Sequence, residues 1–410
     1  MKNILFIHPN FPAQFRHIAR VLAQKGHQVI FVTANDRKDW QIPGVRRMLY
    51  KSPGEKEEPG IFGGLRRAEG HAEAALRACA ELRRRGFVPD VVYGASGWGC
   101  TWFLRDVFPE ARLAGYFEWY YDPAGDNARF GGHEPSLANR AELRLRNTVM
   151  VNDLLTCDVC ITPSQWQKRQ FPENLRERLV ALHDGIETGY FRPSDEPLDI
   201  PGLELPSGAP IVTYATRGME PYRGFPQFIE ALGVILEKSP GTHAVIAGAD
   251  RVCYGSPRGD GKTWKEYMLS RVPLPMNRVH FVGSLPYGPY RRLLCHSSVH
   301  VYLTRPFVLS WSMLEAMSCS CLVVASDTGP VREVIRDGEN GLLYDFFSPG
   351  AIARTVLRAL ERQSGLRPLR EAARKTIVER YELGDVLPRL EQLLLGAEKE
   401  MGVEKQELSF

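Results

Sequence analysis

The chain has 410 residues, of which 44% are hydrophobic and 24% charged, and its formal net charge is +4. These values are ordinary for a globular protein of two or three domains. A charge this small, with no basic run dominating any segment, excludes a typical nucleic-acid-binding protein. No apolar window approaches the roughly 18 residues that a membrane-spanning helix needs, so we expect no transmembrane segment.

The first residues, MKNILFIHPNFP, contain only a short apolar run before His8 and Pro9. That run is too short for the core of a signal peptide, so we expect a cytoplasmic protein. Two arginine groups, Arg83–Arg85 and Arg140/Arg144/Arg146, are interpreted as solvated helix faces. The alternative is a patch that faces an anionic membrane or acceptor, which leaves peripheral contact with the inner face of the cell membrane open.

The eight cysteines fit the same compartment as small buried residues. Cys157 and Cys160 form a C-x-x-C pair, and Cys319 and Cys321 form a C-x-C pair. A zinc ribbon needs two such pairs at suitable spacing, and these pairs lie far apart in the sequence. We therefore predict structural cysteines and no metal site.

The first half of the chain alternates apolar strand-like runs with helical patterns. Between residues 12 and 25, apolar side chains recur every three or four positions, which predicts a helix that Gly26 ends. The predicted strands cover residues 3–8, 28–33, 91–94, 113–117, 159–162 and 179–182, and the predicted helices cover residues 12–25, 71–85 and 97–107. Alternation of this kind is typical of a parallel α/β sheet.

Residues 193–210 carry five prolines and few core-forming runs, so they are predicted to link two domains. The same alternation then restarts. Its predicted strands cover residues 211–215, 243–247, 279–282, 299–303 and 321–325, and its predicted helices cover residues 225–237, 288–295, 311–318, 348–362, 368–380 and 384–395. We predict two Rossmann-like domains in series, with boundaries at 1–195 and 196–385, and a C-terminal helix and tail at 386–410 that can pack back on the first domain.

The most informative segment begins at Arg305 and reads RPFVLSWSMLEAMSCSCLVVASDTGPVREVIRDGENG. It places Glu315 in a predicted helix that precedes a buried strand. The free N–H groups at a helix N-terminus suit a phosphate, and a carboxylate one turn into the helix can accept hydrogen bonds from a ribose diol. The segment therefore indicates a nucleotide-like ligand; the alternative is a surface glutamate on an ordinary helix.

Two arginines bracket the loop between the first strand and first helix of the second half, in TYATRGMEPYRGFPQFIEAL. Arg217 follows the strand and Arg223 precedes the helix. Guanidinium groups bind phosphate through paired hydrogen bonds, so both side chains can serve one anionic site. Two exposed loop arginines remain the alternative.

Together these motifs, with the elements FVGSLPY and GHQVIFVT and the segment CDVCITPSQWQKRQFPENLRERLVALHDGIET, resemble the retaining GT-B glycosyltransferases of family 4. The resemblance spans roughly residues 1–395. It implies a GT-B fold, with two Rossmann-like doubly wound domains facing a central cleft. It also implies transfer of a sugar from a nucleoside diphosphate, UDP favoured, to an acceptor hydroxyl with retention of anomeric configuration, in polysaccharide, glycolipid or other glycoconjugate synthesis.

The resemblance further assigns roles to residues. Arg217 and Arg223 would neutralise the leaving diphosphate, and Glu315 would hold the ribose. Backbone groups at Leu309, Ser310 and Trp311 would contact the donor, and Gly283 of FVGSLPY would lie near the base. The partners implied are a nucleotide-sugar donor and a sugar, lipid-linked or small-molecule acceptor.

Three positions depart from the family pattern. Phe307 stands where the first glutamate of Glu-x7-Glu would contact the donor sugar. Glu118 stands near a position where relatives place a histidine, so it is a candidate catalytic residue or an exposed strand-end acid. In the first loop, Phe11-Pro12-Ala13-Gln14 replaces a Gly-Gly pair that is common in relatives, and Phe11 and Gln14 are assigned to the acceptor side. His183 is a further acceptor-side candidate, with a structural role as the alternative.

No Asp-x-Asp triplet occurs in the chain, so neither a metal nor another cofactor is expected. In the family's front-face mechanism no enzymic nucleophile is needed, because the leaving phosphate takes the proton of the acceptor. Two other hypotheses stay open. One is a sugar-nucleotide epimerase on the same fold, and the other is a non-catalytic sugar-nucleotide-binding protein, which the Phe307 substitution favours.

Overall fold

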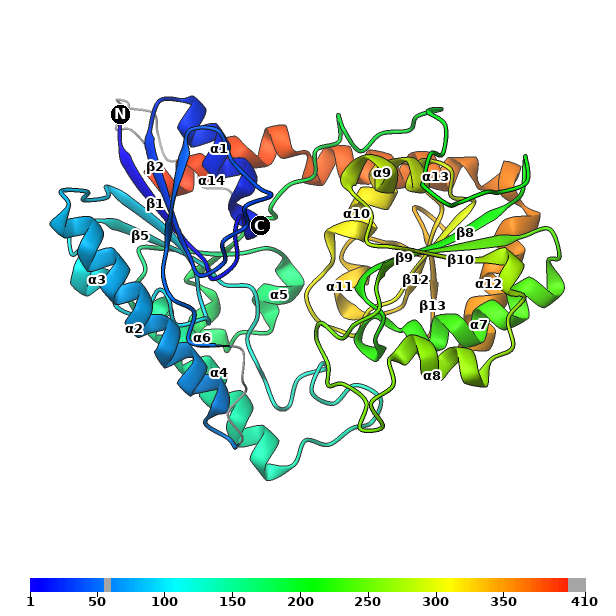
Figure 1. The fold of residues 1–410 in the computed structure, drawn as a ribbon, viewed down its shortest axis with the longest axis horizontal. Coiled ribbons are helices and arrows are strands. Elements are labelled where there is room, and N and C mark those ends of the chain that lie inside the picture. The colour runs from blue at the N-terminus through cyan, green and yellow to red at the C-terminus, as the bar shows by residue number, and fades with distance from the viewer. Residues whose placement is uncertain (55–59, 397–410) are drawn as a thin grey trace, which may run out of the picture. The chain divides into compact units, whose positions relative to one another are not determined.

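The computed structural model describes residues 1–54 and 60–396, and the chain forms two compact units (Figure 1). Of these residues, unit 1 comprises 1–54, 60–123, 135–184 and 385–396, and unit 2 comprises 124–134 and 185–384. The division therefore falls at Asp184 and Gly185 rather than at residue 195, and it assigns the short segment 124–134 to unit 2. The domain boundaries predicted at residues 195 and 385 remain predictions.

Unit 1 is built on a seven-stranded sheet in the order β3-β2-β1-β4-β5-β6-β7, with every strand pair parallel. Its strands are β1 (Asn3–Ile7), β2 (Gln28–Thr33), β3 (Val45–Leu49), β4 (Val91–Ala95), β5 (Arg112–Tyr116), β6 (Val159–Thr162) and β7 (Leu179–Ala181). The central strands are apolar throughout because helices cover both faces of the sheet.

Two helical layers enclose this sheet. Leu5 and Ile7 point into one core with the helices α2 and α4, whereas Ile4 and Phe6 point into the other with α1 and the C-terminal helix α14. The helices of unit 1 are α1 (Arg16–Gln24), α2 (Gly63–Arg84), α3 (Leu104–Val107), α4 (Leu137–Thr156), α5 (Gln165–Arg169), α6 (Glu173–Arg176) and α14 (Leu383–Leu395), with a 3-10 turn η1 (Ala13–Phe15) before α1.

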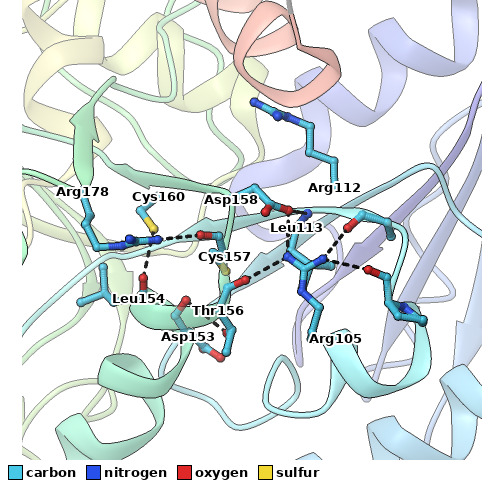
Figure 2. Close-up of polar contacts among 12 residues, drawn as sticks. Arg105, Arg112, Leu113, Asp153, Leu154, Thr156, Cys157, Asp158, Cys160 and Arg178 are labelled. Carbon is cyan, nitrogen blue, oxygen red and sulfur yellow. Dashed lines mark hydrogen bonds and ion pairs between the residues drawn. The ribbon is translucent and has the colours of Figure 1, made fainter.

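Polar contacts fix the N-terminal ends of β5 and β6 (Figure 2). Arg105 donates to the backbone oxygens of Pro109, Ala111 and Thr156 and to the carboxylate of Asp158 at 2.8 Å. The C-x-x-C pair lies in the same region, where Arg178 donates to the carbonyl of Cys157 and the Cys160 thiol contacts the carbonyl of Leu154. Both cysteines therefore pack as structural residues at the strand ends opposite to those where ligands bind in this type of sheet.

Unit 2 repeats the architecture with a six-stranded parallel sheet in the order β10-β9-β8-β11-β12-β13. Its strands are β8 (Ile211–Gly218), β9 (His243–Ala249), β10 (Val279–Gly283), β11 (Val299–Tyr302), β12 (Val323–Ser326) and β13 (Leu342–Tyr344). Its helices are α7 (Phe225–Lys238), α8 (Trp264–Arg271), α9 (Tyr287–Cys295), α10 (Trp311–Ser318), α11 (Gly329–Arg332), α12 (Pro349–Glu361) and α13 (Arg367–Tyr381), with 3-10 turns η2 (Pro221–Arg223), η3 (Met276–Arg278) and η4 (Gln363–Leu366).

Helices again cover both faces of the sheet. The core between the sheet and the α7/α12 pair includes Tyr214, Phe228 and Val356. The core on the other face includes Met313 and Met317 of α10 and Ile377 of α13. Across the part of the chain that the structure describes, no helix is both long and apolar enough to cross a lipid bilayer.

Several predicted elements were wrong or incomplete. The helix predicted for residues 97–107 exists only at Leu104–Val107, because Gly97 and Gly99 adopt φ values of 91° and 92° that interrupt a helix. The strand predicted for 321–325 begins at Val323 and ends at Ser326. The short edge strands β3 and β13, and the helices α4 and α8, were not predicted. The predicted helix 311–318 and the strands 28–33 and 159–162 have the predicted bounds.

Candidate functional site

The strand order of both sheets places a topological switch point at their centres. In unit 2 the chain runs outward in one direction from β8 and in the other from β11, and these two strands are neighbours. Loops that leave the carboxyl ends of two such strands diverge and open a crevice, where doubly wound sheets bind ligands. The loop after β8 contains η2 with Arg223, and the loop after β11 leads through Thr304 to α10.

The guanidinium group of Arg223 is buried in this crevice region, with the whole residue 7% exposed. Its Nη1 donates to Thr304 Oγ1 at 2.7 Å, to the Tyr302 hydroxyl at 3.4 Å and to the Val308 carbonyl at 3.5 Å. All three acceptors are neutral, and among the described residues no carboxylate forms an ion pair with Arg223. A buried charge without a counter-charge is costly, so the arrangement favours an anionic ligand.

The N-terminus of α10 adjoins this cation. Ser310 is the N-cap residue, and its hydroxyl accepts a hydrogen bond from the backbone N–H of Ser312. The Tyr302 hydroxyl accepts from both Ser310 N, at 3.1 Å, and Arg223 Nη1. One phenol oxygen therefore joins the guanidinium to the start of the helix. The positive end of the helix dipole and the Arg223 charge would act on the same anion.

Glu315 lies one turn into α10 and is 5% exposed. The remaining residues around it on the helix are buried and apolar, including Leu314 and Ala316. Burial, followed by the nearby charge of Glu315, raises the pKa of the Tyr290 hydroxyl on α9 well above its ordinary value. The alternative of a surface glutamate is thus excluded, because Glu315 is buried inside the unit on the helix that begins beside Arg223.

Arg217 differs from Arg223 in exposure. It lies at the end of β8, where the pairing with β9 is irregular between Ala215 and Gly218, and its side chain is exposed. The two strand ends approach so closely that a Cβ atom at Gly248, whose φ is 143°, would lie 2.3 Å from the carbonyl oxygen of Thr216. Glycine is therefore required there, and Arg217 projects from a rigid strand end rather than from a mobile loop.

The other predicted donor residues fall into two groups. Phe307, Ser310 and Trp311 are partly exposed in the β11–α10 connection, whereas Leu309 is 7% exposed and belongs to the core beside α10. Gly283 ends β10, an edge strand that β9 separates from β8. The structure therefore brings Arg223, Phe307 and the start of α10 together and leaves Gly283 two strands away from the switch point. The roles assigned to all of them remain predictions.

In unit 1 the predicted acceptor-side residues also follow strand ends. Gln14 lies in η1 after β1, and Glu118 lies just after β5. The Gln14 amide donates to the Glu118 carboxylate at 3.5 Å, a long contact, and the Gln167 amide donates to the Glu118 backbone oxygen at 2.6 Å. The fold therefore brings Gln14 and Glu118 together within unit 1.

Phe11 and His183, the other two acceptor-side candidates, are both buried in unit 1. Phe11 is 2% exposed and packs edge-on against Phe31, with the Arg47 guanidinium 4.9 Å from its ring centre. Its side chain is thus part of the core, and its acceptor-side role remains a prediction. His183 is 8% exposed, and burial lowers its pKa to about 4, so the imidazole is neutral near pH 7. A structural role was the alternative for His183, and its burial favours that alternative.

Sequence patterns missed four residues near the two switch points. His8 follows β1 in unit 1 and accepts a hydrogen bond from Asn10 N at 2.8 Å, and burial lowers its pKa to about 3. The ring of Trp98, 39% exposed, lies 5.9 Å from the His8 ring. In unit 2, Tyr302 and Thr304 hold Arg223. Tyr302 and Thr304 lie at or just after the end of β11, a central strand, and that position could have identified them. The sequence alone does not give the order of the strands, so it does not show that β11 is central.

All eight cysteines are free thiols; six are buried, and Cys253 and Cys295 are partly exposed. Within residues 1–54 and 60–396, no group of three or more His, Cys, Asp and Glu side chains is arranged to hold a metal ion. Metal independence of the reaction remains a prediction.

Comparisons with known proteins agree with this architecture. The model of the glycosyl transferase family 4 group matches residues 25–191, and the model of glycosyl transferases group 1 matches residues 195–376. A D-inositol 3-phosphate glycosyltransferase of Acidothermus cellulolyticus is 28% identical over 189 residues, which are 45% of this chain and 41% of that protein. The chain thus matches about two fifths of the length of this curated relative.

Two solved structures share the fold over nearly the whole chain. Sucrose-phosphate synthase of Thermosynechococcus elongatus superimposes with a TM-score of 0.74 at 18% identity, over 96% of this chain and 98% of that one. HepE of Anabaena, solved in complex with UDP and glucose, superimposes with a TM-score of 0.72 at 16% identity, over 96% and 99% of the two chains. With family models covering both halves and two Rossmann-like units of GT-B type, the chain belongs to the group 1 glycosyltransferases of family 4.

Proposed function

We propose that the protein transfers a sugar from a nucleoside diphosphate, UDP in preference to GDP, to an acceptor hydroxyl with retention of anomeric configuration. The observation that carries the proposal is Arg223, a buried guanidinium that lacks a described counter-charge and is joined to the start of α10 through Tyr302. A diphosphate supplies the missing negative charge. HepE, solved with UDP and glucose, supports this choice of ligand class.

The chemistry follows from where charge develops. Departure of the diphosphate places negative charge on oxygens beside Arg223 and the N-terminus of α10, and preorganised donors there lower the barrier. Arg217, exposed at the end of β8, would add a second cation that closes on the bound anion. Glu315 would hold the ribose diol, as acidic residues do in other nucleotide sites.

In the proposed mechanism the leaving phosphate accepts the proton of the acceptor hydroxyl, so no residue acts as a covalent nucleophile. Gln14 and Glu118, which are in contact in unit 1, would orient the acceptor. We propose that the reaction is independent of metal, on the ground that arginines and a helix N-terminus supply the positive charge. Full activity after removal of divalent cations with EDTA is the expected result.

The acceptor belongs to polysaccharide, glycolipid or other glycoconjugate synthesis in this proposal, and peripheral membrane contact is part of it. Side chains exposed at the starts of two helices of unit 1 support such contact: Phe62, 47% exposed, and Leu137, 83% exposed, with Arg140 one turn further on. Arg84 and Arg85, by contrast, both pair with Glu81 and are less available to an anionic surface.

A thermal-shift screen with UDP, GDP and their sugar conjugates tests the proposal, because a ligand that binds the folded state raises its stability. A positive donor is then incubated with simple glycosides and lipid-linked sugars, and NMR of the product reports its anomeric configuration. Stabilisation by one nucleotide and a product with the donor's configuration are expected. A non-catalytic binding protein, favoured by Phe307, would instead bind a donor without transferring it to any acceptor.

A further inference from the structure

Three aromatic rings lie beside the Arg223 guanidinium in unit 2. Tyr222 adjoins Arg223 in the β8–α7 loop, Tyr254 follows β9, and Phe307 follows β11. Each ring contacts the other two, with centroid distances of 6.1 Å for Tyr222–Tyr254, 5.7 Å for Tyr222–Phe307 and 5.8 Å for Tyr254–Phe307. We name this group the aromatic triad.

The triad adjoins the cation directly. The Arg223 guanidinium carbon lies 5.0 Å from the centre of the Tyr254 ring, which is within the range of a cation–π contact. All three rings remain accessible in part, and Tyr254 is 38% exposed. Partly exposed aromatic surface next to a buried cation is the composition of a ligand site that takes an anion and an attached ring together.

Contacts from outside the triad hold two of its members, Tyr254 and Tyr222, in place. The fully buried carboxylate of Glu220 accepts hydrogen bonds from the backbone N–H groups of Cys253, Tyr254 and Gly255 at 2.9–3.1 Å. This carboxylate therefore fixes the loop that carries Tyr254. Tyr222 donates its hydroxyl to Asn127 Oδ1 at 3.1 Å.

The Arg305 guanidinium lies over the other side of the triad, 4.7 Å from the centre of the Tyr222 ring. It also donates to the backbone oxygen of Asn127 at 3.0 Å. The triad is thus an ordered wall, fixed at Tyr222 and Tyr254 by contacts from outside it.

The aromatic triad presents mainly carbon atoms, whereas sugar hydroxyls need hydrogen-bonding partners. Phe307 has no polar side-chain atom, the Tyr222 hydroxyl is donated to Asn127, and the Tyr254 hydroxyl interacts with Arg223. A sugar hydroxyl pressed against the Phe307 ring would lose water without gaining a hydrogen bond from that ring, which is unfavourable. A C–H face or a methyl group would instead gain contact area.

Resting on the proposed function, we propose that the aromatic triad is the subsite for the donor's sugar ring and that the preferred donor carries a 6-deoxyhexosyl group. Arg223 takes the diphosphate, and the sugar attached to that diphosphate then meets the triad next to it. The exocyclic C6 is the sugar position at which loss of oxygen leaves a methyl group that can pack on the rings.

The test compares the affinities of three ligands by isothermal titration calorimetry. The ligands are the free diphosphate, a hexosyl donor and its 6-deoxy counterpart: UDP, UDP-glucose and UDP-6-deoxyglucose, or GDP, GDP-mannose and GDP-rhamnose. The wild-type protein should bind the 6-deoxy donor about fivefold to tenfold more tightly than the hexosyl donor, since apolar contacts discriminate modestly.

Two substitutions of Phe307 test whether the aromatic triad contacts the sugar. In Phe307→Ala the affinity for the 6-deoxy donor should fall at least tenfold, and the affinity for the free diphosphate should fall less than twofold. In Phe307→Glu the preference should reverse toward the hexosyl donor. Phe103→Leu, which removes a ring that is 38% exposed in unit 1, is the control and should leave all three affinities unchanged.

Each contrary outcome has a distinct meaning. If Phe307→Ala lowered the affinities for the free diphosphate and for the donor equally, the rings would belong to the nucleotide site. If the wild-type protein bound the hexosyl donor more tightly, the preference for a 6-deoxy sugar would be excluded. Either result overturns this inference and leaves the proposed function standing. Failure of the wild-type protein to bind UDP or GDP overturns the proposed function and, with it, the inference. Phe307→Tyr, which keeps the ring, should retain the wild-type order of affinities and excludes misfolding as the cause of the losses.

Discussion

Replacement of Arg223 by methionine separates binding from folding. The side chain is buried, its three acceptors are neutral, and no described carboxylate compensates its charge. Methionine keeps much of the apolar stem and removes the charge. If Arg223 serves a ligand rather than the fold, the variant should fold normally and lose its nucleotide.

The magnitude follows from the contacts that change. Tyr302 keeps its hydrogen bond from Ser310 N, and Thr304 keeps its donation to the Arg305 carbonyl, so the acceptors left behind are only partly unsatisfied. Relief of a buried charge, worth several kcal/mol, offsets their loss. We expect the free energy of unfolding to change by less than about 2 kcal/mol, which shifts Tm by less than about 8 °C for a domain of this size.

The effect on binding should be much larger. Loss of one partner of a buried charge pair costs about 2–5 kcal/mol, a decrease in affinity of about 30-fold to several thousand-fold. A nucleotide present at 100 times the wild-type Kd stabilises the wild-type protein by about 2.7 kcal/mol. If the Kd rises 100-fold, the same concentration stabilises the variant by only about 0.4 kcal/mol.

Differential scanning fluorimetry with and without UDP or GDP measures both quantities. Arg278→Met is the control, because Arg278 also donates only to neutral acceptors, the carbonyls of Leu236, Ser239 and Thr242 near the end of α7. The control should lower Tm and keep the nucleotide-induced shift. A variant Arg223→Met with a Tm lowered by more than about 10 °C and an intact nucleotide shift would refute the reasoning.

Three further predictions concern the buried carboxylates Glu315, Glu220 and Asp153. Glu315→Gln should weaken nucleotide binding at least tenfold in calorimetry while changing Tm little; unchanged affinity would remove Glu315 from the site. Glu220→Ala should lower the free energy of unfolding by about 2–4 kcal/mol in urea titrations, because three backbone N–H groups lose the buried carboxylate that accepts from them; a loss under 1 kcal/mol would contradict this. Burial raises the pKa of Asp153 to about 6 although Ser96 and Thr101 donate to it, so the folded state binds the proton more tightly than the unfolded state and stability should fall as pH rises from about 4 to 6; Asp153→Asn should remove this component of the pH profile, and an identical profile would contradict the assignment.

The alternating pattern was sufficient to predict two parallel-sheet domains, because central strands such as β2 and β6 are buried on both faces and therefore read as continuous apolar runs. Edge strands gave no such signal. Residues 45–49, VRRML, form β3 although two arginines interrupt the run, since an edge strand buries less of its surface. Helix α4 was missed because its 20 residues have only weak amphipathic periodicity.

Within the site, the motifs pointed to Arg223 and Glu315, but they could not distinguish buried from exposed side chains. The sequence pattern gives Arg217 and Arg223 equivalent places on either side of one loop, whereas in the structure only Arg223 is buried. Tyr254 could not be predicted because it reaches Arg223 through a loop fixed by Glu220, and that contact joins segments more than 30 residues apart. Phe11 was assigned to the acceptor side by its place in the loop where relatives carry a Gly-Gly pair, and that resemblance does not show whether its side chain is buried.

The most direct measurement of the central claim is a crystal structure of the protein with the nucleoside diphosphate that stabilises it. The diphosphate oxygens should lie within hydrogen-bonding distance of the Arg223 guanidinium and the first N–H groups of α10, and the ribose hydroxyls should contact Glu315. An ordered nucleotide that leaves Arg223 without an anionic partner would contradict the account.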